Sequence, residues 1–503
     1  MPGYFIGIDV STTASKALVI DERGAVVASH SHAHDLSTPR PLWSEQDPRQ
    51  WWRATCISLR AVLQHVGPDD IAAIGLTGQM HGLTLLDARD QPIRPAILWN
   101  DGRSGPQCAA VTEQVGAAWL YQQIGSMMLP GFTAPKIRWV QENEPEIYAQ
   151  IARVLLPKDY VRLLLTGAHV TDVSDGSGFG LMDIGRRAWS DAMLAAFDIP
   201  RAWLPELCES PVVCAQISAA GAAATGLRAG TPVVGGAGDQ PATAIGSGIL
   251  GRGQTSITVG TSGVVFTAND QYQPEPEGRL HTFCHAVPGY WFHMGVMLSA
   301  AGGMRWLRDA LAADTSYAEL SELAAQAPRG SAGLLFVPYL TGERHPHPDP
   351  LARGGFVGLT LRSELRHMAR AVMEGVAFGM RDNLELLRAR GVQPATAAVS
   401  GGAAQSDLWR AIITDIAGIP LYTVNSTEGA ALGAAILAAV GAGAWPDVPA
   451  ACAELIQTVD VTEPSADGVA DYERLYPIYR QLYPALRATF QELAAFEADS
   501  PST

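Results

Sequence analysis

Lysine is almost missing from this chain, because only Lys16, Lys136 and Lys158 occur among its 503 residues. Basic residues number 35 against 50 acidic ones, which gives a formal net charge of −15 at pH 7. Such a surplus of negative charge repels a nucleic-acid backbone or an anionic membrane surface, so we expect neither as a partner. Any phosphate-binding site must then depend on local groups rather than on the overall field.

Long hydrophobic runs and paired cysteines are missing as well. The longest apolar stretch, 430–444, is rich in Ala and Gly and too short to span a bilayer, so it predicts a closely packed buried helix. The first ten residues have no basic region, which argues against a signal peptide. The cysteines have neither a metal-type nor a paired spacing, and we expect reduced thiols and a cytoplasmic protein. They are Cys56, Cys108, Cys208, Cys214, Cys284 and Cys452.

The length and composition indicate a large packed enzyme. A chain of 503 residues is too long to fold around a single hydrophobic core, so two large domains are expected. Strand patterns such as 71–76 and 83–86 alternate with helical ones, and the capping-type segment 44–48 begins a helix. This alternation favours an α/β architecture.

A strand–turn–strand pattern occurs twice. Apolar segments 4–8 and 17–20 flank a hydroxyl-rich turn, and 255–259 with 264–266 flank a second one. The repeat predicts two domains built on one plan. With the glycine-rich segment 246–253 as a hinge, we expect an N-terminal domain at 1–248 and a C-terminal domain at 249–503.

The two turns have the composition of phosphate-binding sites. Backbone N–H groups and hydroxyls of such turns can point at phosphate oxygens. Asp9 can hold Mg²⁺, which prefers hard oxygen ligands, and Lys16 can offset phosphate charge. Either turn alone is better explained as an ordinary polar hairpin, but a matching pair in two domains favours a grip on one nucleotide. The hydroxyl-bearing residues are Thr12, Thr13, Thr261 and Ser262.

Three other strand ends carry candidate site residues. After the apolar segment 232–234, glycines allow close backbone approach and Asp239 begins a helix, either as a helix cap or as a general base. The segment 77–82 ends a strand with a polar cluster, in which a histidine is either structural or a ligand contact. The segment 400–406 predicts a turn that leaves room for a flat ligand, or a purely structural turn. Asp101 and Arg103 are expected to pair with each other.

Two long segments resemble signatures of the FGGY carbohydrate kinases, a branch of the group that includes actin and Hsp70 ATPases. They are 131–143 (GFTAPKIRWVQEN) and the segment that runs from Gly355-Phe356-Val357-Gly358-Leu359 to Glu374-Gly375. The resemblance extends from Tyr4 to near Ala495. It implies two RNase-H-like α/β domains around a central cleft, with ATP and Mg²⁺ as cofactors and a small sugar as acceptor.

Further segments resemble the xylulokinases within that family. They are 42–48 (LWSEQDP), 78–82 (GQMHG), 94–103 (RPAILWNDGR), 156–160 (LPKDY) and 342–344 (GER). This resemblance implies phosphorylation of D-xylulose to D-xylulose 5-phosphate in pentose catabolism. A homodimer is also possible.

The resemblance also implies a role for each site residue. Asp239 is the expected base, Asp9 acts with it in catalysis, and both are expected metal ligands. The expected sugar contacts are Met80, His81, Gln240 and Asp239. The expected nucleotide contacts are Thr12, Thr13, Lys16, Thr261, Ser262, Gly401, Gly402 and Ser406.

Two positions depart from the family pattern. Ser11 stands where the family commonly has glycine, and Gln240 stands where xylulokinases commonly have asparagine. Asp-Gln resembles glycerol kinases, so glycerol, ribulose or a pentitol is an alternative acceptor. An ATP-driven interaction protein of the Hsp70 or actin type is an alternative of another class.

Overall fold

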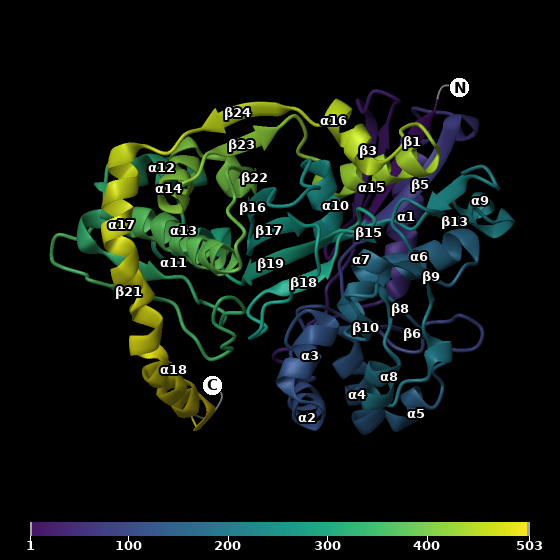
Figure 1. The fold of residues 1–503 in the computed structure, drawn as a ribbon, viewed down its shortest axis with the longest axis horizontal. Coiled ribbons are helices and arrows are strands. Elements are labelled where there is room, and N and C mark those ends of the chain that lie inside the picture. Colours follow the sequence, from purple (N-terminus) through teal and green to yellow (C-terminus); the bar gives the residue numbers. More distant parts are fainter. Residues whose placement is uncertain (1–2, 500–503) are drawn as a thin grey trace.

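The computed structural model describes residues 3–499, which build two large mixed sheets with helices packed around them (Figure 1). The first sheet has the order β13-β14-β5-β1-β2-β3, and β15 also pairs with β5. Its strands are β1 (Tyr4–Val10), β2 (Ala14–Ile20), β3 (Val26–Ala33), β5 (Ile71–Gly78), β13 (Val213–Gln216), β14 (Pro232–Val234) and β15 (Ala237–Gly238).

The second sheet has the order β18-β19-β17-β16-β22-β23-β24. Its strands are β16 (Thr255–Val259), β17 (Gly263–Asn269), β18 (His281–Cys284), β19 (Trp291–Met297), β22 (Ala397–Gly401), β23 (Leu421–Val424) and β24 (Thr458–Thr462).

The two sheets share one plan, which confirms the predicted repeat. In each, an antiparallel hairpin (β1–β2 or β16–β17) pairs through its first strand with a parallel strand, β5 or β22. The first turn is shorter than the sequence indicated. Asp9 and Lys16 lie opposite each other in β1 and β2, and only residues 11–13 connect the strands.

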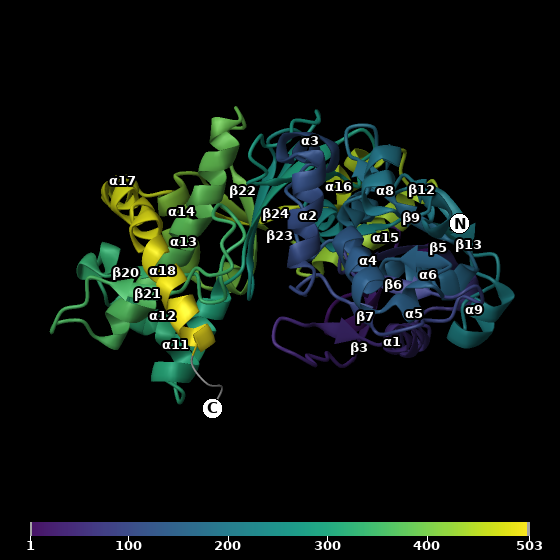
Figure 2. The ribbon, with the colours of Figure 1, turned by 90° about the horizontal axis from the view of Figure 1, so that it is seen from below.

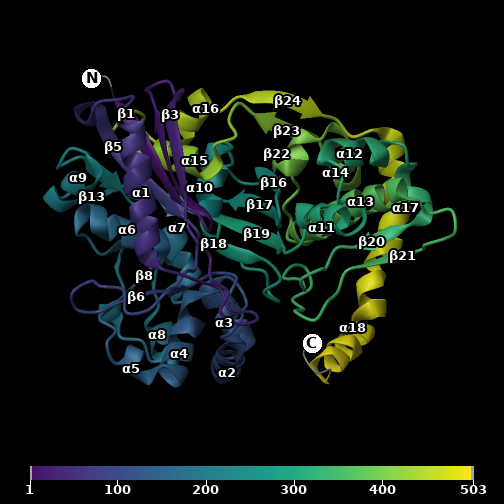
Figure 3. The same ribbon diagram turned by 180° about the vertical axis from the view of Figure 1, so that it is seen from behind.

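The predicted Ala-rich buried helix is confirmed as α15 (Gly429–Gly441), and it packs directly on the first sheet. A Cβ atom at Gly7 would lie 1.9 Å from the Ala431 carbonyl oxygen, and one at Gly75 would lie 2.1 Å from that of Ala434. Only glycine permits so close an approach of helix and strand. In Figure 3, α15 and the following α16 (Val448–Leu455) lie beside β1 and β3, although both helices come from the second half of the chain.

Helices of the second half form the other lobe, seen from below in Figure 2. The longest is α13, and α17 and α18 run along the outer end of the molecule. The tail is helical as predicted, although the helix begins earlier than expected and breaks at Gln481. These helices are α11 (Ala301–Leu311), α12 (Tyr317–Ala325), α13 (Leu365–Ala389), α14 (Asp407–Ala417), α17 (Ala466–Arg480) and α18 (Leu482–Asp499).

The remaining elements lie mostly between the first hairpin and β16. The helices are α1 (Pro48–Val62), α2 (Gly105–Val115), α3 (Ala117–Ile124), α4 (Thr133–Asn143), α5 (Pro145–Tyr148), α6 (Pro157–Thr166), α7 (Val173–Gly176), α8 (Asp191–Phe197), α9 (Ala219–Thr225) and α10 (Asp239–Gly246). The short strands are β4 (Glu45–Gln46), β6 (Thr84–Leu86), β7 (Ala96–Ile97), β8 (Arg153–Leu155), β9 (Val170–Asp172), β10 (Met182–Asp183), β11 (Ala188–Trp189), β12 (Glu206–Cys208), β20 (Leu335–Val337) and β21 (Gly355–Val357).

Within residues 3–499, no helix is long and apolar enough to cross a membrane.

Candidate active site

Three parallel strands of the first sheet bring the predicted acidic residues and sugar contacts together. Asp9 of β1 lies in register with Thr77 of β5, and Gly238 of β15 lies in register with Gly78. The carboxyl ends of β1, β5 and β15 therefore meet at one edge of the sheet. Asp9, the segment that follows β5 and Asp239 converge there, as the sequence predicted.

The charge of Asp239 influences the ionisation of Asp9. Burial above all, together with the charge of Asp239 and against the opposing charge of Lys16, raises the pKa of Asp9 to about 7. Burial also raises the pKa of Asp239, and after the lowering effect of hydrogen bonds from the backbone and side chain of Gln240 it stands at about 6. The Oδ1 atom of Asp9 is buried and has no hydrogen-bond partner. Such paired, perturbed carboxyl groups are typical of functional sites.

Asp239 is the first residue of α10, not its cap. Gly238 occupies the N-cap position and, as a glycine, supplies no capping side chain. Gly238 rather than Asp239 is therefore the N-cap residue, while the Asp239 carboxyl group accepts hydrogen bonds from the backbone and side chain of Gln240. An ionised carboxylate at this end of a helix is favoured by the helix dipole.

A fully buried ion cluster holds the segment that leads to Asp239. The Arg162 guanidinium donates to the carbonyl oxygens of Val234 and Gly235, both at 2.5 Å. Ser174 Oγ accepts a hydrogen bond from Gly238 N at 3.2 Å. The sequence reasoning missed Arg162, whose only signal is an arginine one helical turn after Lys158 in a helix that is otherwise buried.

Lys158 neutralises the acidic part of the same cluster. Its Nζ atom lies 2.6 Å from Asp159 Oδ1, 2.9 Å from Asp172 Oδ2 and 3.1 Å from Asp175 Oδ2. Burial, with the neighbouring carboxylates, raises the pKa of Asp175 well above its usual range. Arg162 supplies the second basic group of the cluster, with its Nε atom 3.5 Å from Asp159 Oδ1. Through Arg162 the cluster contacts the backbone that leads to Asp239.

Met80 and His81 follow β5 and face the same strand ends. A Cβ atom at Gly238 would lie 2.8 Å from the Met80 side chain, so the glycine makes room for the methionine. His81 has a left-handed φ of 68°, which is uncommon for a residue with a side chain. Its carbonyl oxygen is held in that conformation by Thr133 Oγ1 at 2.9 Å and Lys136 Nζ at 3.1 Å.

The His81 ring is fixed and neutral. Its Nδ1 atom lies 3.0 Å from the Gly178 carbonyl oxygen, and because a carbonyl only accepts, we assign the proton to Nδ1. The ring stacks on Phe132 with 4.9 Å between centroids. Burial lowers the pKa of His81 to about 3, so Nε2 is an acceptor at neutral pH. A sugar hydroxyl that binds there must donate.

Side chains from two other segments of the N-terminal half hold the first turn. Trp99 Nε1 donates to Thr12 Oγ1 at 3.1 Å, and Gln46 Nε2 donates to the Thr12 carbonyl oxygen at 2.6 Å. Thr13 is exposed. Lys16 forms an ion pair with Glu428, the residue just before α15. Neither Trp99 nor Gln46 was expected here, since each is more than thirty residues away in sequence.

The second turn and the glycine pair after β22 also lie side by side. Val259 and Gly401 are in register at the carboxyl ends of β16 and β22. A Cβ atom at Gly401, whose φ is +83°, would lie 2.5 Å from the Val259 carbonyl oxygen, so this position requires glycine. Thr261 is exposed, and its carbonyl oxygen accepts hydrogen bonds from Ala300 N and Gly302 N.

The last three predicted nucleotide contacts flank this edge. Gly402 is exposed and Ser262 is half-buried. Ser406 caps α14 through Trp409 N at 3.3 Å and bonds Ser321 Oγ at 3.0 Å. The structure gives the Ser406 hydroxyl a helix-capping function, and its nucleotide contact stays a prediction.

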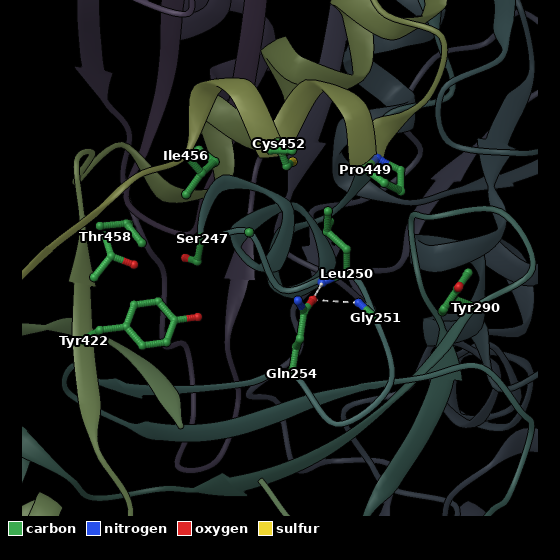
Figure 4. Close-up of a pocket in the computed structure, with 13 residues that line it drawn as sticks. Ser247, Leu250, Gly251, Gln254, Tyr290, Tyr422, Pro449, Cys452, Ile456 and Thr458 are labelled. Carbon is green, nitrogen blue, oxygen red and sulfur yellow. Dashed lines mark hydrogen bonds between the residues drawn. The ribbon is translucent and has the colours of Figure 1, made fainter. Parts of the chain in front are cut away.

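A cavity of about 460 Å³ lies elsewhere, beside the connection between α10 and β16 (Figure 4). Its lining includes Ser247, Gln254, Tyr422 and Cys452, and none of the predicted site residues. Figure 4 shows α16 above this cavity and the connection between α10 and β16 below it, in the segment where the sequence predicted a hinge.

With this geometry described, comparison with known proteins identifies the family. The model of the N-terminal domain of the FGGY family of carbohydrate kinases matches residues 4–246, and that of the C-terminal domain matches residues 255–442. The chain belongs to the FGGY family of carbohydrate kinases. It is therefore a phosphotransferase that uses ATP, and its two lobes have the RNase-H-like fold that FGGY kinases share with actin and Hsp70.

Individual relatives match the chain along nearly its whole length. The xylulose kinase of Escherichia coli (strain K12) is 41% identical over 486 residues, which cover 96% of this chain and 99% of that protein. The crystal structure of a xyloylose kinase from Brucella ovis shares 40% identity with a TM-score of 0.91, covering 97% of this chain and 100% of that one. A gluconate kinase from Lactobacillus acidophilus is also similar, at 28% identity and a TM-score of 0.93 over 98% of this chain and 100% of that one.

Proposed function

We propose that this FGGY kinase transfers the γ-phosphoryl group of ATP to D-xylulose and yields D-xylulose 5-phosphate. The observation that carries the proposal is the convergence of Asp9, Met80, His81 and Asp239 at the carboxyl ends of three parallel strands. Relatives named xylulose kinase, at 34–42% identity over nearly the full chain, support the choice of acceptor.

In this proposal Asp239 is the general base. It takes the proton of the acceptor hydroxyl as that oxygen forms its bond to the γ-phosphorus and the bond to the ADP oxygen breaks. A pKa of about 6 leaves Asp239 mostly ionised at neutral pH, yet nearer to that of a useful base than an ordinary aspartate. Arg162 holds the backbone that leads to Asp239, so alignment is expected to contribute to the rate beside basicity.

Asp9 and the two turns would bind the nucleotide. The buried, unpartnered Oδ1 of Asp9 fits a magnesium ion or its water shell, and Asp239 is the second candidate ligand. Mg²⁺ would neutralise the charge of the phosphates. Within residues 3–499, no three His, Cys, Asp or Glu side chains gather into a ready-made metal site, so the phosphates themselves would complete the coordination.

Acceptor choice would depend on His81 and Gln240. His81 Nε2 accepts a hydrogen bond, so an acceptor hydroxyl must be present at that point, and analogues that lack it leave a buried nitrogen unpaired. Because Gln240 also bonds the Asp239 carboxyl group, it influences base and acceptor together. We also propose a cytoplasmic location, because ATP is consumed and all six cysteines are free thiols.

The experiment is an acceptor panel with purified enzyme, ATP and Mg²⁺. D-xylulose, D-ribulose, glycerol, xylitol and gluconate are compared by kcat/KM, and phosphorus NMR locates the phosphate on the product. We expect D-xylulose to be preferred, with glycerol weaker because it has fewer hydroxyls to meet His81. A preference for any other acceptor would refute the substrate and leave the kinase assignment intact.

Gln240→Asn separates the alternatives for the residue that departs from the family pattern. If glutamine is a tolerated variation, the substitution keeps D-xylulose preferred and changes its efficiency only modestly. If Gln240 defines another acceptor, the wild-type enzyme prefers glycerol, ribulose or a pentitol, and the substitution shifts the ratio toward D-xylulose.

A further inference from the structure

Two of the six cysteines lie against each other beside the segment that leads to Asp239. Cys208 is the last residue of β12, and Cys214 lies in β13, the edge strand of the first sheet. The Cys208 Sγ atom donates to the Thr171 carbonyl oxygen at 3.6 Å, and the two thiols are close enough to shift each other's pKa. Both side chains are half-buried, so small reagents can reach them. Of the other four cysteines only Cys56 is as accessible, because the rest are buried.

A β-bulge places the Cys214 thiol. The register between β13 and β14 shifts between Val213 and Ala215, which makes Cys214 the extra residue. Bulges at sheet edges re-aim a side chain that would otherwise follow the strand alternation. Here the Cys214 Sγ atom donates to the Val233 carbonyl oxygen at 3.5 Å and accepts from Arg162 Nη1 at 3.4 Å.

The surroundings favour a thiolate on Cys214. The neighbouring Cys208 thiol and the charge of Arg162, whose Nη1 atom lies 3.4 Å from Cys214 Sγ, lower the pKa of Cys214 to about 6, although burial opposes them. The same pairing raises the pKa of Cys208. By contrast, burial raises the pKa of Cys56 to about 11. Because the thiolate is the reactive form, Cys214 is the expected nucleophile among the accessible cysteines.

We propose that Cys208 and Cys214 form a reversible disulfide, a modification site at which a low-molecular-weight disulfide such as oxidised glutathione slows the kinase. The Cys214 thiolate attacks one sulfur of oxidised glutathione, whose S–S bond breaks and releases one glutathione thiol. Cys208 then loses its proton, attacks Cys214 Sγ and releases the second glutathione. Two protein thiols are oxidised, and one glutathione disulfide is reduced to two thiols that carry the protons.

Arg162 connects this dithiol to the catalytic segment. The same guanidinium that contacts Cys214 donates to the Val234 and Gly235 carbonyl oxygens. Cys208 touches Gly235 as well, since a Cβ atom at Gly235 would lie 2.8 Å from its sulfur. A disulfide removes the negative charge that faces Arg162 and moves both sulfurs, so the path from Gly235 to Asp239 shifts. This effect on rate rests on the proposed role of Asp239 as the base.

The experiment compares enzyme treated with oxidised glutathione and enzyme treated with dithiothreitol. Free thiols are counted, peptide mass mapping locates any disulfide, and turnover is measured with ATP and the acceptor selected by the panel. We expect a loss of two thiols, a Cys208–Cys214 cross-link and a turnover at least about fivefold lower, because small misplacements at the reacting centre have large effects on rate. Dithiothreitol restores both thiols and turnover.

Matched variants identify the site. Cys214→Ser is expected to form no disulfide at this site and to keep its turnover in oxidised glutathione. Cys208→Ser is expected to stop at a mixed disulfide of Cys214 with glutathione and to form no intramolecular disulfide, whereas Cys56→Ser behaves like the wild type. Cys208→Ala serves as a second variant if the serine disturbs folding. Retention of all six thiols, or oxidation at other cysteines, would overturn the site. A mapped disulfide with unchanged turnover would overturn the link to Asp239. Thiol mapping uses no sugar, so it is independent of the proposed acceptor.

Discussion

Asp239, at the start of α10, is the residue whose ionisation should control the rate. The general base must be ionised, and its pKa of about 6 means that it takes up a proton at higher pH than an ordinary aspartate. We therefore expect kcat/KM to fall as the pH decreases through about 6. In Asp239→Asn, turnover should fall at least about a hundredfold, and binding of ATP and sugar should remain.

The pH profile of the residual activity provides the control. Asp239→Asn has no carboxyl group to titrate at that position. Its residual kcat/KM should therefore lack the decrease that the wild type shows as the pH falls through about 6. Near-normal turnover in a folded Asp239→Asn variant would exclude the residue as the base.

The ionisation of Asp9 should affect the stability of the folded protein. Its folded-state pKa of about 7 lies above the value of 3.8 for an ordinary aspartate, so ionisation of Asp9 destabilises the native state, and this loss grows as the pH rises through about 7. Asp9→Asn avoids the buried charge. We expect its melting temperature to exceed that of the wild type more at pH 8.5 than at pH 5.5.

Asp314→Asn, at an exposed aspartate, is the matched comparison for the Asp9 measurement. Its difference from the wild type should stay constant over the same pH range. An equal difference for Asp9→Asn at both pH values would show that the Asp9 carboxyl group is not destabilised by burial.

Residue identities in the site were predictable only where the residues follow a strand. Asp9, Met80, His81 and Asp239 stand at strand ends, and strand ends are readable from hydrophobic pattern. Their supports were not: Lys136 reaches the His81 carbonyl oxygen across 55 residues of sequence, and Arg162 reaches Val234 across 72. No local pattern encodes which backbone carbonyl a buried cation will meet.

At the scale of elements, the turn of the β16–β17 hairpin uses the backbone and the side chain of Thr261 differently. The Thr261 carbonyl oxygen anchors the chain around Ala300 and Gly302, while its hydroxyl accepts only a 3.3 Å hydrogen bond from the exposed Arg305. The hydroxyl is therefore available to phosphate. Thr261→Val keeps the backbone anchor, so we expect phosphoryl transfer to slow about tenfold, as for the loss of one transition-state hydrogen bond, with little change in sugar binding.

Thr261→Ser restores the hydroxyl and should recover most of that rate. Transfer of labelled phosphate at the wild-type rate in Thr261→Val would leave the Thr261 hydroxyl without a role in the chemistry, and would weaken the prediction that both turns serve one ATP.

The strand–turn–strand repeat was predictable at this scale because each buried strand forms a continuous apolar run between polar turns. The lengths of the turns were less accurate: Asp9 and Lys16 were expected in the first turn but lie in the strands. A residue with a polar side chain can still belong to a strand when the backbone of a neighbouring strand pairs with it, as β5 pairs with Asp9. Sequence alone does not show which strands will be neighbours.

At the scale of the whole molecule, helices α15 and α16 cross from the second half of the chain to the first sheet. Their side chains share one core with Phe5, Leu18 and Ala73. The small residues of α15 were readable as a sign of close packing, but its partner was not, because a helix with small residues all around fits many surfaces. Whether residues 1–248 form a domain by themselves stays a prediction, as does the possible homodimer.

Fragments of the chain test that division. Without α15, residues 1–248 would expose the glycine surface of β1 and β5 and lose part of a shared core. We expect the fragment 1–248 to unfold without cooperativity and to bind a hydrophobic dye, and co-expression with 249–503 to restore a folded complex. In the full chain, Gly75→Val places side-chain atoms where the Ala434 carbonyl oxygen lies 2.1 Å from a Cβ, so unfolding should become easier by on the order of 3 kcal/mol. Gly355→Val, at a strand glycine whose Cβ would meet no neighbour within 4 Å, is the comparison that lacks this clash. A cooperative thermal transition of 1–248 alone would instead establish the first half as an independent domain, with α15 as an accessory helix.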